Sequence, residues 1–116
     1  IQSAHIVRAW KGEADWQAIV QLYQALAALT GSPIAHLNAA AAIARRDGAQ
    51  AGFTALDAAR QRFAVLADYQ PYWALLADLC AKTGRFEAAR TAYREATARE
   101  SDHGVIRFLE ERIAAL

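Results

Sequence analysis

Glycine and proline divide this chain at regular intervals, and the segments between them carry apolar residues at helical spacing. Gly31, Gly48 and Gly84 each follow such a segment, where a glycine readily takes the left-handed conformation that ends a helix. Pro33 and Pro71 fit first helical positions, where a missing N–H costs nothing. No segment alternates apolar and polar residues over a useful length, so we expect helices and no strands.

Residues that can cap a helix indicate where we expect three of the helices to begin. The carboxylate of Asp15 and the hydroxyl of Ser32 can accept from amides of the first turn, and Ser101 or Asp102 can do so for the last helix. One expected helix, carrying Phe53 to Leu66, has no glycine to close it before Tyr69. The other expected helices are 1–10 (stopped by Gly12), 16–30, 33–46, 71–83, 86–96 and 103–116.

The helices at 71–83 and 86–96 carry a recognisable pattern of large and small residues. It reads Trp73-x2-Leu76-Ala77-x2-Cys80, then Ala89-x3-Tyr93 and Ala96. This matches the hairpin signature of the tetratricopeptide repeat (TPR). The alanines let two antiparallel helices approach closely, and Trp73, Leu76, Phe86 and Tyr93 are expected to fill the space between one hairpin and the next.

We therefore predict an all-α fold: a single TPR-like domain over 1–116, built as an array of three helical hairpins and a C-terminal capping helix. The hairpins are 1–31, 32–69 and 70–102, and the capping helix is 103–116. The second hairpin matches the repeat less well, with a shorter turn, and the first matches only in outline. The alternative is an alanine-rich helical bundle whose glycines are ordinary helix stops.

Several classes of function lack support in the sequence. A net charge of +1 gives no strong electrostatic footprint for nucleic acid. His5, His36 and His103 show no ligand spacing, and Cys80 fits an inert core position. No apolar run reaches the roughly 18 residues of a membrane span. We expect no catalytic set, metal, cofactor, small-molecule ligand, membrane contact or direct nucleic-acid contact, and a cytoplasmic location.

A protein-binding groove is the remaining candidate site. The first helix of each hairpin lines the concave face of a TPR array, and four polar residues occupy the inward positions here: Asn38, Arg45, Asp78 and Lys82. The alternative is structural: Asn38 bonds a neighbouring turn, and Asp78 pairs with Lys82 four residues on. The arginines of the second half of the chain are expected to form ordinary surface salt bridges.

A more specific resemblance covers nearly the whole chain. It rests on the order and spacing of several short segments. These are Asp15–Ile19, Leu22–Leu26, Thr30–Pro33 with Leu37-Asn38, Asp47-Gly48, Ala77–Leu79, Thr83–Arg85 and Phe108–Arg112. In these segments the chain resembles the C-terminal, TPR-like extension of a group of extracytoplasmic-function (ECF) sigma factors of bacterial RNA polymerase. It departs at Ala39 and Leu76, where we expect arginine, so any polar contact that those arginines make in relatives is lost here.

The resemblance implies what a parent protein would do. Two sigma domains before Ile1, not included in this chain, would bind promoter DNA and core polymerase, and the extension would control sigma activity through contacts with those domains or with RNA polymerase. The absence of methionine even at position 1 agrees with a piece of a longer protein. The alternative is a stand-alone TPR adaptor or scaffold with unrelated partners.

Overall fold

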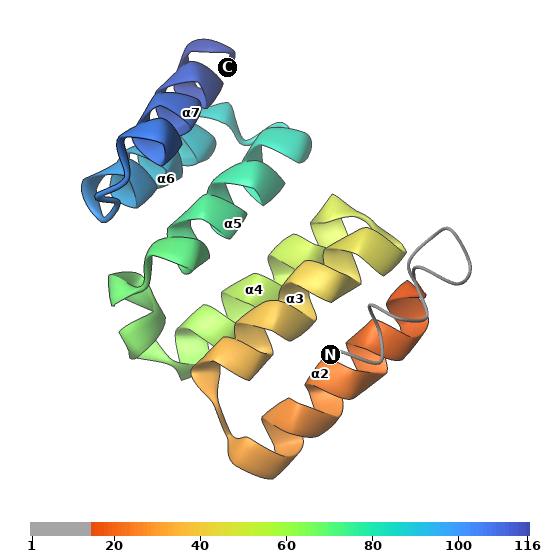
Figure 1. Ribbon diagram of the computed structural model, residues 1–116. Helices are drawn as coiled ribbons and strands as arrows, with labels where there is room; N and C mark the ends of the chain where they lie inside the picture. The colour runs from red at the N-terminus through yellow and green to blue at the C-terminus, as the bar shows by residue number, and fades with distance from the viewer. Residues whose placement is uncertain (1–14) are drawn as a thin grey trace. The chain divides into compact units, whose positions relative to one another are not determined.

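The computed structural model describes residues 15–116, and this part of the chain is helical with no strand (Figure 1). Its elements are α2 (Trp16–Thr30), α3 (Pro33–Asp47), α4 (Ala49–Arg62), the 3-10 helix η1 (Ala64–Asp68), α5 (Gln70–Lys82), α6 (Phe86–Ala98) and α7 (His103–Ala114). The all-α prediction is confirmed, and successive helices pack in hairpin-like contacts, as in a helical repeat array. The helix expected at 1–10 and its stop at Gly12 lie outside the described residues.

Side-chain caps mark the starts of several helices, and glycines mark the ends of others. Asp15 Oδ1 accepts from the amide of Ala18 at 3.1 Å, and Ser32 Oγ accepts from Ala35 at 3.3 Å. Asp102, rather than Ser101, caps α7. The three glycines at helix ends have positive φ: Gly31 at 63°, Gly48 at 104° and Gly84 at 80°. Gly31 takes the expected left-handed conformation, while Gly48, with ψ 164°, is more extended.

The end of α4 differs from the prediction. The helix stops at Arg62, and Phe63 is extended, with φ −123° and ψ 91°. The chain then tightens into η1, which buries Leu66 to 1% exposure. Phe63 is half-buried, with the guanidinium carbon of Arg62 at 5.0 Å from its ring centre. The helix thus ends without a glycine, and Leu66, which was expected on the same helix, is buried from η1 instead.

The helices group into two compact units, with the boundary at Ala59 and Arg60, near the end of α4. In unit 1, α2 packs against α3, and Gly52 of α4 lies against Ala44 of α3. A Cβ on Gly52 would lie 2.3 Å from Ala44 Cβ, so only glycine permits this approach of the two helices. Gly48 alone connects α3 to α4, a shorter turn than the one between α5 and α6, as predicted.

In unit 2, α5 packs against η1 and α6, and α6 packs against α7. α5 buries residues on more than one side: Tyr72, Ala77, Leu79 and Cys80. α6 buries its alanines and one large residue: Ala89, Ala92, Tyr93 and Ala96. Phe86, which was expected to fill space between hairpins, is 54% exposed, so that expectation is wrong. Phe86 is the first residue of α6, one turn before its buried stripe begins.

Candidate functional site

The four residues predicted to line a groove fall into both units. Asn38 and Arg45 lie on α3 in unit 1, and Asp78 and Lys82 lie on α5 in unit 2. Each pair is therefore described within its own unit. A groove formed by all four stays a prediction.

Asp78 and Lys82 form an ion pair, as the structural alternative expected. Lys82 Nζ lies 2.9 Å from Asp78 Oδ2, across one turn of α5. Both side chains are partly open to solvent, with 57% and 36% exposure for Lys82 and Asp78. A pair this exposed contributes little to the free energy of unfolding, because water screens it.

Residues of α6 and α7 lie close to this pair. Arg112 on α7 is near enough to Tyr93 of α6 and to Asp78 for both to act on its ionisation. Both interactions raise the pKa of Arg112, with the Tyr93 bond the larger cause. We name Asp78, Lys82, Tyr93 and Arg112 the α5–α7 polar cluster. It brings side chains from three consecutive helices together.

Sequence reasoning missed this cluster, since Arg112 was counted among ordinary surface arginines. One signal was present. The TPR signature has phenylalanine at the position of Tyr93, and tyrosine adds a hydroxyl to a site that is 97% buried, at 3% exposure. A tyrosine hydroxyl in such a site usually has a hydrogen-bonding partner, and Arg112 is the side chain that interacts with Tyr93 here.

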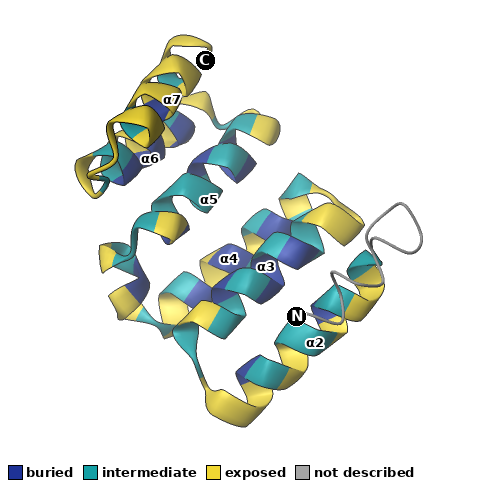
Figure 2. Cartoon of the chain, in the orientation of Figure 1, coloured by how far each residue is buried: buried dark blue, intermediate teal, exposed yellow. Residues whose placement is uncertain are grey.

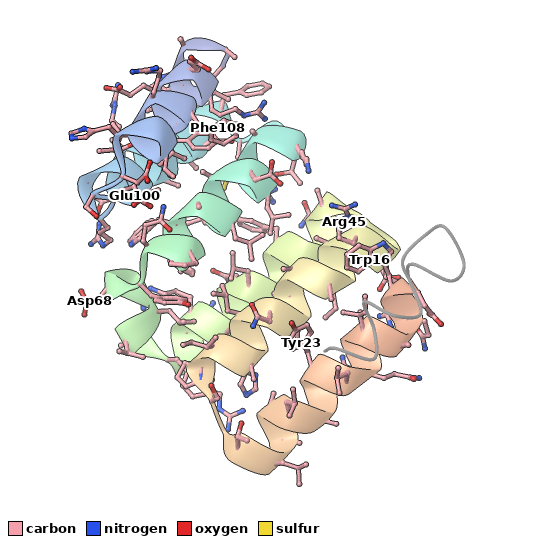
Figure 3. The ribbon with its side chains drawn as sticks, viewed as in Figure 1. Trp16, Tyr23, Arg45, Asp68, Glu100 and Phe108 are labelled. Carbon is pink, nitrogen blue, oxygen red and sulfur yellow. The ribbon has the colours of Figure 1, made fainter. Side chains whose placement is uncertain are left out.

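Arg45 has a different setting in unit 1. Its guanidinium carbon lies 4.8 Å from the ring centre of Trp16, at the start of α2 (Figure 3). Such a cation–π contact is worth about 0.5–1 kcal/mol at an exposed site. Next to it, Arg46 donates to Gln17 Oε1 at 2.7 Å and pairs with Asp47. The C-terminal end of α3 is thus attached to the first turn of α2.

Trp73 in unit 2, like Trp16 in unit 1, lies in the first turn of its helix with an arginine over its ring. Its indole Nε1 donates to the carbonyl of Ala67 in η1 at 2.7 Å. The guanidinium carbon of Arg99 lies 5.3 Å from its ring centre, and the ring of Tyr72 meets it edge-on at 5.0 Å. These contacts hold η1 and the end of α6 against the first turn of α5.

Cys80 is unsuited to nucleophilic chemistry. It is 1% exposed, and this burial raises the pKa of its thiol, an effect that the charge of Arg85 offsets only in part. The thiolate is therefore scarce at neutral pH and shielded from solvent. Among residues 15–116 no group of three or more His, Cys, Asp or Glu side chains is placed to hold a metal ion. The chemistry available at the polar cluster is ion pairing and hydrogen bonding.

Comparison with known proteins gives one relative. The chain is 35% identical over 106 residues to an uncharacterized protein of Rhizobium meliloti. The match covers 89% of this chain but 24% of the relative, so the chain spans about a quarter of that protein's length. No protein family and no solved structure matches the chain. Over residues 15–116, no helix has the length and apolar character needed to cross a bilayer.

Proposed function

We propose that the chain is the C-terminal regulatory domain of an ECF sigma factor, acting in the cytoplasm through contacts with its own sigma domains or with RNA polymerase. The parent protein would bind promoter DNA and core polymerase. The observation that carries the proposal is the set of motifs in order and spacing from Asp15 to Arg112, which resembles that extension over nearly the whole chain.

Two further observations agree with this proposal. Alanine-rich helices packed as consecutive hairpins are the construction of repeat proteins, whose extended surfaces serve binding. The Rhizobium meliloti relative is roughly four times as long as the segment that matches it, which leaves room in that protein for further domains.

Sequencing the gene on the 5′ side of the Ile1 codon distinguishes the two hypotheses, a sigma factor and a stand-alone adaptor. A sigma factor requires a promoter-binding helix-turn-helix encoded shortly before Ile1. A reading frame without such a segment would exclude the sigma assignment and leave the adaptor.

A substitution experiment tests the predicted contact face in the parent protein. We expect the double variant Asn38→Ala, Asp78→Ala to lower transcription from the parent's promoter several-fold while the helical circular dichroism stays unchanged. Asp68→Ala is the matched control, because its carboxylate projects away from the helices of unit 2 (Figure 3). Equal transcription by the double variant and the control would contradict the predicted contact face.

A further inference from the structure

One side of α2 carries large apolar side chains that lie away from α3. The helix packs on α3 along the side of Trp16 and Gln17, which contact two arginines near the C-terminal end of α3. Val20 and Ala27 share that side and are buried. The other large apolar residues of α2 lie on a different side of the helix.

These residues form a stripe of their own, which we name the α2 stripe: Ile19, Leu22, Leu26 and Leu29. They recur every three or four residues, and at 100° per residue their centre lies roughly 130° around the helix from the buried side. Leu29 is 84% exposed, and the other three are half-buried (Figure 2). The stripe is thus continuous over three turns and only partly covered.

α2 has the composition of a helix that is covered on two sides. It has no charged side chain, and its polar side is formed by three glutamines: Gln17, Gln21 and Gln24. A helix that faces solvent over most of its circumference carries polar and charged residues there, whereas apolar sides are packed against neighbours. The α2 stripe therefore indicates a second neighbour besides α3.

The part of the chain that leads into α2 has a matching pattern. The sequence predicts a helix over 1–10, in which Ile6, Val7 and Trp10 share one side. Residues 11–15 connect this segment to α2, a usual length for the loop of a helical hairpin. Five extended residues span up to about 17 Å, against roughly 8–10 Å between the axes of packed helices. The connection is therefore long enough to reverse the direction of the chain.

We propose that residues 1–10 form a helix that covers the α2 stripe and runs antiparallel to α2. Ten helical residues extend about 15 Å, which is also the length of the stripe. In this arrangement Trp10 lies beside Ile19, and Val7 lies beside Leu22. Apolar side chains of both helices are then buried against one another.

Covalent attachment favours this occupant over a separate molecule. A segment tethered by a short connection is present at an effective concentration of about millimolar, so a second copy or another protein must bind the stripe more tightly to displace it. The contact gives the predicted first hairpin a defined surface and removes the α2 stripe from the surfaces open to a partner. This inference does not depend on what the chain regulates.

Hydrogen exchange of the backbone amides of residues 1–10, measured by nuclear magnetic resonance on the 116-residue chain, tests the proposal. A helix this short is unstable by itself in water, so its protection reports packing. We expect exchange at least about tenfold slower than in an unfolded chain. Leu22→Glu, which places a charge in the stripe, should remove this protection. Ala28→Glu, at an exposed position outside the stripe, should keep it.

Val7→Glu changes the other side of the contact. Because it leaves α2 itself unaltered, it keeps the test decisive if Leu22→Glu disturbs the packing of α2 on α3. It should remove the protection of residues 1–10 while the amides of α3 stay protected. Unprotected amides in the unaltered chain, or protection that survives both changes, would overturn the proposal. Protection that rises with chain concentration would identify a second copy on the stripe and overturn it equally.

A spin label tests the direction of the helix. Ala25→Cys offers an exposed attachment site beside the stripe, and Cys80 does not compete for the label because it is 1% exposed. In the antiparallel arrangement the label lies near residues 1–4 and should broaden their amide signals more than those of residues 8–10. The opposite order, or equal broadening, would exclude the antiparallel helix.

Discussion

The two units hold their helices together by different means. In unit 1 the fifteen residues of α2 include no charged side chain, and α4 approaches α3 through Gly52 and Ala44, where no other atoms fit. The polar contacts described there, from Arg45 and Arg46, lie at exposed helix ends. In unit 2, polar groups of large and mostly buried residues are bonded across elements: Trp73 to η1 and Tyr93 to α7.

This difference indicates which changes each unit should tolerate. Packing that depends on close approach is sensitive to added volume. Packing that depends on directed hydrogen bonds is sensitive to loss of a single donor or acceptor, because the partner left behind loses its hydrogen bond, at a cost that grows with its burial. Added volume should therefore destabilise unit 1 most, and loss of one donor or acceptor should destabilise unit 2 most.

The largest effect is expected for Gly52→Val in unit 1. The new side chain would meet both Cβ and Cα of Ala44, the latter at 2.9 Å from the first added atom, so the helices must separate. We expect the free energy of unfolding to fall by about 3 kcal/mol or more. Urea denaturation followed by circular dichroism measures it. Ala58→Val, at an exposed position of the same helix, is the control, and an equal loss in both would contradict the close approach.

Trp73→Phe in unit 2 should have the next largest effect. It removes the indole N–H bonded to Ala67 and leaves that carbonyl without its partner, a cost of about 1–2 kcal/mol together with the lost volume. Trp16→Phe in unit 1 keeps an aromatic ring under Arg45 and should cost less. If Trp16→Phe proved the more destabilising change, as measured by thermal unfolding of both variants, the contrast between the units would fail.

Tyr93→Phe isolates the hydroxyl of the polar cluster. Its loss should lower the free energy of unfolding by about 1 kcal/mol, since Tyr93 is almost fully buried. In an Arg112→Gln background the same change should cost clearly less, because the bond is already altered. Identical costs in the two backgrounds, from a double-mutant cycle in urea, would show that Tyr93 and Arg112 do not act together.

The smallest effect is expected for Lys82→Met. The ion pair with Asp78 is exposed, so the free energy of unfolding should change by no more than about 0.5 kcal/mol. Urea denaturation at low and high salt measures the change and its screening. A loss several times larger would mean that Lys82 holds the cluster together, rather than Tyr93.

What the sequence predicted was local in origin. Asp15 and Ser32 cap helices that begin directly after them, and Gly31, Gly48 and Gly84 end helices through their own backbone conformation. These features depend on residues a few positions apart, so periodicity and propensity suffice to find them.

What the sequence did not predict arises from contacts between elements. α4 ends at Arg62, with Leu66 buried from η1, and Phe86 is exposed at the start of α6; neither feature follows from the local pattern of residues. The bond between Tyr93 and Arg112 joins residues of two helices, and it could be anticipated only from the need of a buried hydroxyl for a partner. Asp78 and Lys82 could be paired in advance because they lie on one turn.

The most direct test of the proposed function is in vitro transcription by the parent protein and by the same protein lacking residues 15–116. With core polymerase and the parent's own promoter, we expect the truncated protein still to bind core polymerase but to give transcript levels changed several-fold. Restoring the unaltered domain to the chain, but not the Asn38→Ala, Asp78→Ala variant, should return the original level. Equal transcription by the whole and the truncated protein would contradict a regulatory role, and a parent without sigma activity would refute the assignment itself.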